Sequence, residues 1–384
     1  MLSLRAFRSE AKKHLINNPD VGQTRDIFAQ GNCPFNFGEE NTDLAPIINM
    51  MHADRFEPLL AEIGGFSPNE KDVFVAALAE HFLFQRIMFP SHRAQLPIDD
   101  MMAQFVVAKK ILKLKPQAKR VLEIGPGSGN LAFFFRDISL LAQTDVSPSF
   151  YVLQSLVNSF LFGAAFDELA LARADSPDVA DFPPSCVHYP WWELGQIEGQ
   201  TFDVVTSNAN WNEMTAAARQ YYLALCSRVL TPEGIIVSQC LGGNFTGLDW
   251  TGARDLIWAD FIYAGFRPVF FVNRGNTTAP GKFERLLNPI CLGQAVLVPR
   301  THPWWSRGFE SATDFACIEE PLIYATYFRS ADGKLTPSRE DLKQAVKALL
   351  AGPLRRRWTR SWPFFARVKA PPSTLSSGQA SAYR

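Results

Sequence analysis

The sequence lacks the long apolar runs of a membrane protein. None of its stretches reaches the roughly 18 consecutive apolar residues that a transmembrane helix needs. An uninterrupted apolar core of a secretory signal is missing too, because charged side chains lie between Arg5 and Lys13. These absences predict a cytoplasmic protein without a transmembrane segment.

Excess charge of one sign is also absent. Lys plus Arg equals Asp plus Glu at 38 each, so no global field favours a polyanionic partner, and we expect no nucleic acid to bind. The six cysteines form no CxxC pair and no metal-like spacing, which predicts buried free thiols and no recognisable metal site. Metal dependence and oligomeric state, a homo-oligomer included, stay open.

Apolar residues make up 47% of the chain, enough for a large core. Residues 1–115 carry apolar positions at helical spacing and predict a helical N-terminal cap, whereas residues 116–300 alternate short apolar runs with helices, as in a mostly parallel α/β sheet. Residues 301–369 are expected to form an appended segment with one helix, capped by Ser338 with Asp341 three residues later. Residues 370–384 are expected to be a disordered tail. Expected helices of the cap lie at 56–63, 70–89 and 100–114.

The expected sheet has seven strands, of which the last two pair antiparallel. A helix at 253–264 precedes that pair. The strands are predicted at 120–124, 140–144, 187–189, 202–207, 234–239, 266–272 and 294–299.

A glycine-rich turn follows the first of these strands. The sequence VLEI runs into GPGSG, and LAFFF then begins a helix. This arrangement presents backbone N–H groups and a helix N-terminus to a ligand, without Cβ atoms in the way. The dinucleotide fingerprint GxGxxG would place its third glycine at Asn130, so the spacing here is GxGxG instead.

The segment VLEIGPGSG resembles motif I of the class I S-adenosylmethionine-dependent methyltransferases. The resemblance implies a Rossmann-like fold and S-adenosylmethionine as cofactor. Asp145, twenty residues after Gly125, then supplies a carboxylate for the two ribose hydroxyls, although it is also placed to cap the next helix. Residues expected at the cofactor are Glu123, Gly125, Pro126, Gly127, Ser128, Gly129, Asp145, Val146, Pro190, Trp191 and Asn208.

Some of these residues have two readings. Glu123 either approaches the amino acid end of the cofactor or satisfies backbone groups of the loop. Trp191 and Trp192 follow the third strand, where an indole either stacks on adenine or packs in the core.

The acceptor site is expected after the fourth strand, in SNANWNEM at residues 207–214. This segment, FYVLQSLVNSFLF and HYPWWEL resemble the sugar O-methyltransferase family. Glu213 is the expected base or sugar anchor, with a helix-start role as the alternative, and His188 is a second candidate base or a structural strand histidine. Asn210, Trp211 and Asn212 are the expected substrate-binding residues.

The sequence therefore predicts O-methylation of a small hydroxylated molecule, a sugar or glycoside first. N- or C-methylation of another metabolite and a catalytically silent cofactor-binding partner protein are the alternatives. The glycine spacing disfavours a nicotinamide dehydrogenase, and the zero net charge disfavours nucleic acid methylation. A basic aromatic cluster at Arg355, Arg356, Arg357 and Arg360 is expected to be a solvated helix end.

Overall fold

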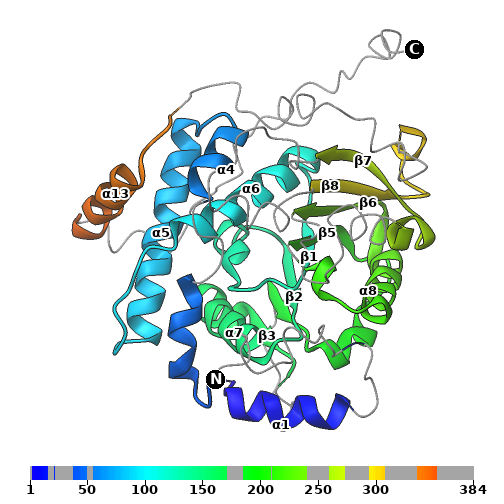
Figure 1. Cartoon of the computed structure of the whole chain (residues 1–384), viewed down its shortest axis with the longest axis horizontal. Coiled ribbons are helices and arrows are strands. Elements are labelled where there is room, and N and C mark those ends of the chain that lie inside the picture. Colours follow the sequence, from blue (N-terminus) through cyan, green and yellow to red (C-terminus); the bar gives the residue numbers. More distant parts are fainter. Residues whose placement is uncertain are drawn as a thin grey trace.

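The protein is an α/β structure in which helices cover both faces of one sheet (Figure 1). The computed structural model describes residues 2–15, 21, 38–49, 55–170, 185–208, 210–239, 259–272, 294–307 and 335–352. This architecture confirms the predicted fold class. The predicted tail at 370–384, the arginine cluster and four of the six cysteines lie outside the described residues. Cys186 and Cys226 are buried free thiols, as predicted.

The sheet has eight strands in the order β3-β4-β2-β1-β5-β6-β8-β7. The six strands from β3 to β6 are parallel, and β8 pairs antiparallel with both β6 and β7. The predicted final pair is therefore confirmed, with β8 placed between β6 and β7. The strands are β1 (Arg120–Ile124), β2 (Leu140–Thr144), β3 (Phe166–Glu168), β4 (Cys186–His188), β5 (Phe202–Asn208), β6 (Leu230–Gln239), β7 (Phe266–Val272) and β8 (Gln294–Pro299).

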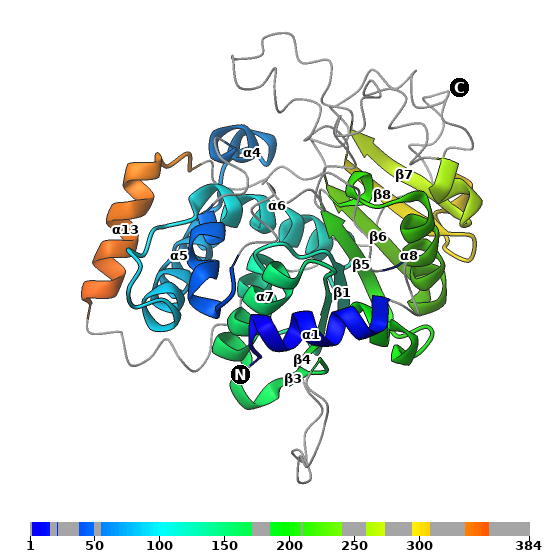
Figure 2. The same cartoon turned by 60° about the horizontal axis from the view of Figure 1, so that its bottom comes forward.

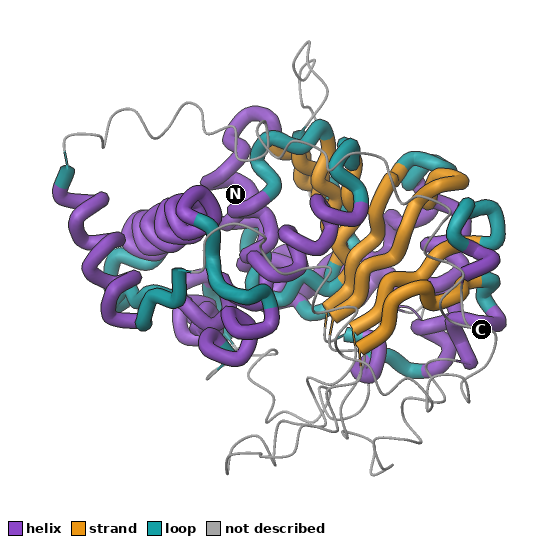
Figure 3. The backbone as a smooth tube through the Cα atoms, turned by 90° about the horizontal axis from the view of Figure 1, so that it is seen from above, coloured by secondary structure: helices purple, strands orange, loops and turns teal. Residues whose placement is uncertain are grey.

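The central strand β1 is buried from Val121 onwards, which explains its apolar sequence. Helices α6 (Ile98–Leu114) and α7 (Pro148–Phe162) lie on one side of the sheet, and α8 (Ala216–Val229) lies on the other (Figure 2). Seen from above, the strands run side by side between these helical layers (Figure 3). Because β1 pairs in parallel with both β2 and β5, the carboxyl ends of these three strands lie together.

The N-terminal region is helical, and a C-terminal helix packs on it. Its elements are α1 (Leu4–Leu15), η2 (Asn41–Asn49), α4 (Phe56–Glu62) and α5 (Pro68–Met88). Helix α13 (Arg339–Ala351) lies alongside α5 (Figure 1), and the Arg339 guanidinium is 2.6 Å from Asp99 Oδ1. The predicted capping box at Ser338 and Asp341 is present.

The structure differs from the sequence-based expectation at the helix after the glycine turn and at one edge of the sheet. The glycine turn leads into a short 3₁₀ helix, η3 (Asn130–Phe134), where a full α-helix was expected. The edge strand β3 was not predicted, because three residues are too few to show an alternating pattern. The remaining short 3₁₀ helices are η4 (Gly163–Ala165), η5 (Trp191–Gln196), η6 (Trp211–Glu213) and η7 (Trp305–Arg307).

Candidate functional site

A cavity lies at the carboxyl ends of β1, β2 and β5, where the strand order reverses. From β1 the sheet grows through β2 on one side and through β5 on the other. The loops leaving such neighbouring strands diverge, which opens a crevice where α/β proteins commonly bind ligands. The cavity is lined by Val21, Ile124, Gly125, Thr144, Asp145, Val146, Asn210, Glu213, Met214, Ala218 and Tyr222.

The glycine turn after β1 forms one wall of this crevice. Gly125 and Gly127 have φ values of +66° and +58°, in the left-handed region that glycine tolerates best. A Cβ on Gly125 would lie 2.0 Å from Asn210 Nδ2, whereas a Cβ on Gly127 would meet nothing within 4 Å. The Gly125 N–H donates to the Thr144 carbonyl at 2.8 Å and ties the turn to the end of β2. The turn is thus closely packed at Gly125 and open at Gly127.

Pro126 and Ser128 are buried within the turn. The Gly129 N–H donates to the Pro126 carbonyl at 3.1 Å and closes it. Because η3 contains only five residues, few peptide dipoles align behind the turn, and the expected helix-terminus contribution to ligand binding is small. Gly125 and Gly129 already donate to carbonyls and Pro126 has no N–H, which leaves the N–H groups of Ser128 and of Gly127, the latter beside the Asp145 carboxylate, as the donors of the turn.

Asp145 follows β2 and faces the same cavity from the other side of the turn. Its side chain accepts hydrogen bonds from the Ser147 N–H at 2.9 Å and from Gln154 Nε2 at 2.8 Å, one on each carboxylate oxygen. The Ser147 N–H lies two residues after Asp145 and before the first residue of α7. This contact is therefore a local turn and not a cap of the helix. Burial raises the pKa of Asp145 to about 6. Val146 lines the cavity beside it.

Asn210 and Glu213 bring the loop after β5 to this cavity. Asn210 Nδ2 donates to the Ile124 carbonyl at 3.2 Å, which fixes the loop against the end of β1. Burial, followed by the charge of Asp145, raises the pKa of Glu213 to about 8. Helix α8 is capped by Thr215, whose Oγ1 accepts from the Ala218 N–H at 3.1 Å. Glu213 is therefore not the helix cap that the alternative reading allowed.

Trp211 and Asn208 lie beside the cavity but do not line it. The Trp211 indole donates to Ser238 Oγ at 3.1 Å and packs edge-on to Phe261, with no exposed surface. These contacts give Trp211 a packing role, and it is not among the residues that line the cavity. Asn208 Nδ2 donates to Thr206 Oγ1 at 3.2 Å. The Asn212 side chain lies outside the described part of the chain.

The residues that end β4 are placed in the core. Trp191 is buried and contacts Trp192 edge-on, so the geometry fits the packing alternative better than adenine stacking. Pro190 is also buried, directly before η5. His188 is fully buried, with partners for both ring nitrogens, Gln154 Oε1 at Nε2 and Ser155 Oγ at Nδ1, each at 3.0 Å. This burial and these contacts favour the alternative of a structural strand histidine over the role of a base.

Glu123 lies inside β1 with 1% of its surface exposed. Its Oε2 accepts from Gln143 Nε2 at 2.7 Å, so it does not satisfy backbone groups of the loop as one alternative required. Oε1 has no hydrogen-bond partner in the described structure. Burial raises the pKa of Glu123 to about 8, so it is mostly protonated at pH 7.

Sequence reasoning missed Tyr222 and Gln154. Tyr222 lines the cavity from α8, and Gln154 contacts the glycine turn from α7. Gln154 carries a signal that could have been used, because it is a polar residue within the apolar segment FYVLQSLV. Tyr222 carries none, since buried aromatic residues at helical spacing are ordinary core positions.

No protein-family model matches the chain, and no curated protein matches it significantly. Several solved structures do match the chain. The 4+2 cyclase SpnF is 15% identical, with a TM-score of 0.37 over 54% of this chain and 83% of its own. A TehB-like SAM-dependent methyltransferase from Corynebacterium glutamicum is 14% identical, with a TM-score of 0.33 over 51% of this chain and 88% of its own.

The O-methyltransferase TomG from Streptomyces achromogenes, involved in tomaymycin synthesis and solved with SAM, is 14% identical. Its TM-score is 0.34 over 58% of this chain and 89% of its own. At these values the comparisons assign no activity to this chain.

Among the helices that the structure describes, none has the length and apolar character needed to cross a bilayer. Within the same residues, no cluster of three or more His, Cys, Asp or Glu side chains is arranged to hold a metal ion.

Proposed function

We propose that the protein is an S-adenosylmethionine-dependent methyltransferase acting on a hydroxyl of a small molecule, with sugars and glycosides as the first acceptors to test. One observation carries the proposal. Gly125, the first glycine of the GxGxG turn, and Asp145 line one cavity at the point where the strand order reverses. A turn without Cβ atoms suits a bulky charged ligand, and a carboxylate suits a ribose diol.

The residues around the cavity fit this cofactor. Gly127 leaves open space over the turn, where a side chain would otherwise stand. Two buried oxygens have no partner among the described residues, Glu123 Oε1 and Thr144 Oγ1, and Thr144 lines the cavity. When bound, the cofactor supplies a methyl group already activated by its sulfonium. The protein then has to hold the cofactor at the turn and Asp145, exclude water and align the acceptor oxygen.

Glu213 is the proposed base for the acceptor. Its carboxyl lies in the same cavity as Asp145, and it is the titratable side chain that the β5 loop contributes there. Ionised Glu213 can take the proton of an acceptor hydroxyl, and Asn210 next to it supplies amide hydrogen bonds. The proposed domain organisation keeps the helical cap at 1–115 over the acceptor side, which the presence of Val21 in the cavity lining supports.

The first test is calorimetric titration with S-adenosylhomocysteine and, separately, with NAD. We expect binding of the first alone, followed by transfer of labelled methyl groups from S-adenosylmethionine to members of a sugar and glycoside panel. An amine panel run in parallel tests the N-methylation alternative. Binding without transfer to any acceptor would favour the silent partner protein, and preference for NAD would overturn the proposal.

The pH dependence of methyl transfer tests Glu213. Because its pKa is raised from 4.5 to about 8, Glu213 is mostly protonated at pH 7 and becomes a base as the pH rises through 8. We expect kcat/KM to increase up to about pH 8 and then to level off. Glu213→Gln should lower the plateau at pH 9 roughly 100-fold, as for loss of a general base, and have little effect at pH 6.

The matched control is Glu198→Gln, because Glu198 is an exposed glutamate outside the cavity. It should reproduce the wild-type profile. S-adenosylhomocysteine affinity should stay within twofold in both variants. An unchanged pH profile in Glu213→Gln would remove Glu213 as the base.

A further inference from the structure

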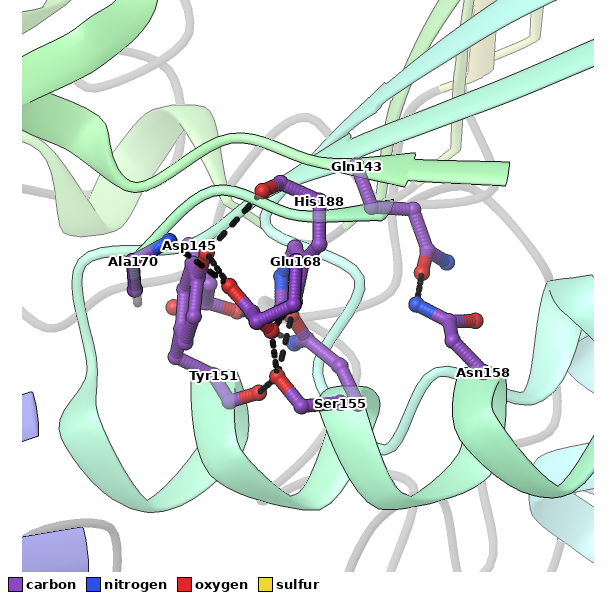
Figure 4. Close-up of polar contacts among 9 residues, drawn as sticks. Gln143, Asp145, Tyr151, Ser155, Asn158, Glu168, Ala170 and His188 are labelled. Atoms are coloured by element: carbon purple, nitrogen blue, oxygen red, sulfur yellow. Dashed lines mark hydrogen bonds and ion pairs between the residues drawn. The ribbon is translucent and has the colours of Figure 1, made fainter. Parts of the chain in front are cut away.

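A buried network of polar side chains connects Asp145 to the edge of the sheet (Figure 4). It begins at Gln154 on α7 and continues through His188 at the end of β4 to Glu168 on β3. His188 is fully buried, and 9% of the Glu168 side chain is exposed. The network thus links three side chains that can carry charge, Asp145, His188 and Glu168, and the Gln154 amide joins the first to the other two.

Gln154 has a single possible orientation in this network. Its Nε2 directs both hydrogens at acceptors, the Gly127 carbonyl at 2.7 Å and Asp145 Oδ2 at 2.8 Å. Its Oε1 therefore faces His188 Nε2, at 3.0 Å, and accepts from it when that nitrogen carries a proton. Flipping the amide would set oxygen against oxygen at two positions and N–H against N–H at the third. One side chain thus holds both halves of the proposed cofactor site.

His188 and Glu168 fix that orientation from behind. His188 Nδ1 lies 3.3 Å from Glu168 Oε2, and the ring stacks on Tyr151 with centroids 3.7 Å apart. Glu168 Oε1 accepts from the Tyr151 hydroxyl at 2.6 Å and from the Ala170 N–H at 3.0 Å. Burial acts to raise the pKa of Glu168, but His188, Ser155 and Tyr151 together hold it below its ordinary value. Glu168 Oε2 beside Nδ1 favours a proton on Nδ1, and Gln154 Oε1 beside Nε2 favours one on Nε2, so the ring donates at both contacts when both nitrogens carry a proton.

The location of the network argues against a role in packing alone. Buried ionic groups are often no more stabilising than well-packed apolar ones. Gln154 lies among apolar residues of α7, where a leucine would also pack. Of the network's contacts, those of Gln154 converge on the turn after β1 and the carboxylate after β2. These two groups come from different βα units. The Gly127 backbone forms a hydrogen bond with the Asp145 carboxylate, and Gln154 adds a second link because it contacts both the Gly127 carbonyl and Asp145 Oδ2.

We propose that Gln154 is a positioning residue of the cofactor site, which fixes the Asp145 carboxylate and the Gly127 carbonyl relative to each other, and that His188 and Glu168 hold it in place. The inference rests on the proposed function for its consequence, cofactor affinity. The geometry itself, the contacts of Gln154 with Asp145 and Gly127, does not depend on that function.

The test compares Gln154→Leu with Gln85→Leu. Gln85 is also a buried glutamine with both ends engaged, accepting from the Gln95 N–H at 2.9 Å and donating to the Gln95 carbonyl at 2.7 Å. It lies on α5, outside the cavity. Both variants should lose thermal stability to a similar extent, since each loses a buried amide. Only Gln154→Leu should weaken S-adenosylhomocysteine binding, by roughly tenfold, as expected for loss of one hydrogen bond to a charged group.

A double-mutant cycle with Asp145→Ala separates positioning from general disruption. If Gln154 acts through Asp145, the double variant should bind S-adenosylhomocysteine about as weakly as Asp145→Ala alone. Effects that multiply, or an affinity of Gln154→Leu within twofold of wild type, would overturn the inference.

The titration of Asp145 gives a readout that needs no cofactor. Carboxyl ¹³C NMR, assigned with Asp145→Asn, should show a higher Asp145 pKa in Gln154→Leu, because the carboxylate has lost a donor. Gln85→Leu should leave it unchanged. If the wild type fails to bind S-adenosylhomocysteine, the proposed function falls, and this titration still decides the positioning role; an unmoved pKa would overturn it. The titratable groups facing Asp145 are Glu123, Tyr151, His188, Glu213 and Tyr222.

Discussion

Asp145→Ala should weaken S-adenosylhomocysteine binding roughly 100-fold or more. A hydrogen bond to a charged group contributes about 1.5–3 kcal/mol, and the proposed ribose contact uses two of them. Every 1.4 kcal/mol or so corresponds to a tenfold change in affinity. Calorimetric titration of wild type and variant at pH 8, where the carboxylate is ionised, measures the difference.

Asp203→Ala is the control for this substitution. Asp203 also accepts hydrogen bonds from two N–H groups, those of Lys119 at 2.8 Å and Arg120 at 3.1 Å. These lie at the amino end of β1, the opposite end of the strand from the cavity. Its variant should lose some stability and keep its cofactor affinity. Equal affinities of Asp145→Ala and wild type would mean that the cofactor is bound elsewhere.

The same carboxylate predicts a pH dependence of binding. The pKa of Asp145 is raised from 3.8 to about 6 by burial, so the group gains a proton as the pH falls through 6. A protonated acid keeps one acceptor oxygen fewer for the ribose diol. Affinity for S-adenosylhomocysteine should therefore decrease below pH 6, by up to about tenfold per pH unit, and remain flat in Asp145→Ala. A wild-type affinity that is constant from pH 5 to 8 would contradict ribose binding by the ionised carboxylate.

Gly125→Ala should abolish measurable cofactor binding and destabilise the fold. Its φ of +66° costs a residue with a Cβ about 1–2 kcal/mol. The added atom would also lie 2.0 Å from Asn210 Nδ2, so Asn210 must move and lose its bond to the Ile124 carbonyl. We expect a total loss of about 2–4 kcal/mol in the free energy of unfolding, measured by denaturant titration.

Gly265→Ala separates backbone strain from this contact. Gly265 has a φ of +84°, and a Cβ there meets nothing within 4 Å, ahead of β7 and away from the cavity. Its variant should lose about 1–2 kcal/mol and bind cofactor normally. If Gly125→Ala were no more disruptive than Gly265→Ala, close packing of the turn against Asn210 would not matter.

Local sequence patterns predicted much of the sheet. The bounds of β1, β2, β7 and β8 match the expected strands at both ends, because each is a short apolar run with turn residues beside it. Strand β6 is longer than expected, beginning at Leu230 instead of Gly234, since its first residues pair with β5 across a register shift. Periodicity along the chain does not show which residues of two distant strands pair, so it could not predict this extension of β6.

The sequence by itself determined the parts of the site that depend on neighbouring residues. A strand followed by alternating glycines requires a turn in which the backbone is accessible. Asp145 follows the next parallel strand, so it lies at the same carboxyl end of the sheet as this turn. Tertiary structure alone decided which side chains enter the cavity. It turned Trp211 into the core, enclosed His188 between α7 and β3, and brought Gln154 to the turn. Those outcomes depend on contacts across the sheet, because the direction of a buried side chain is set by what packs against it.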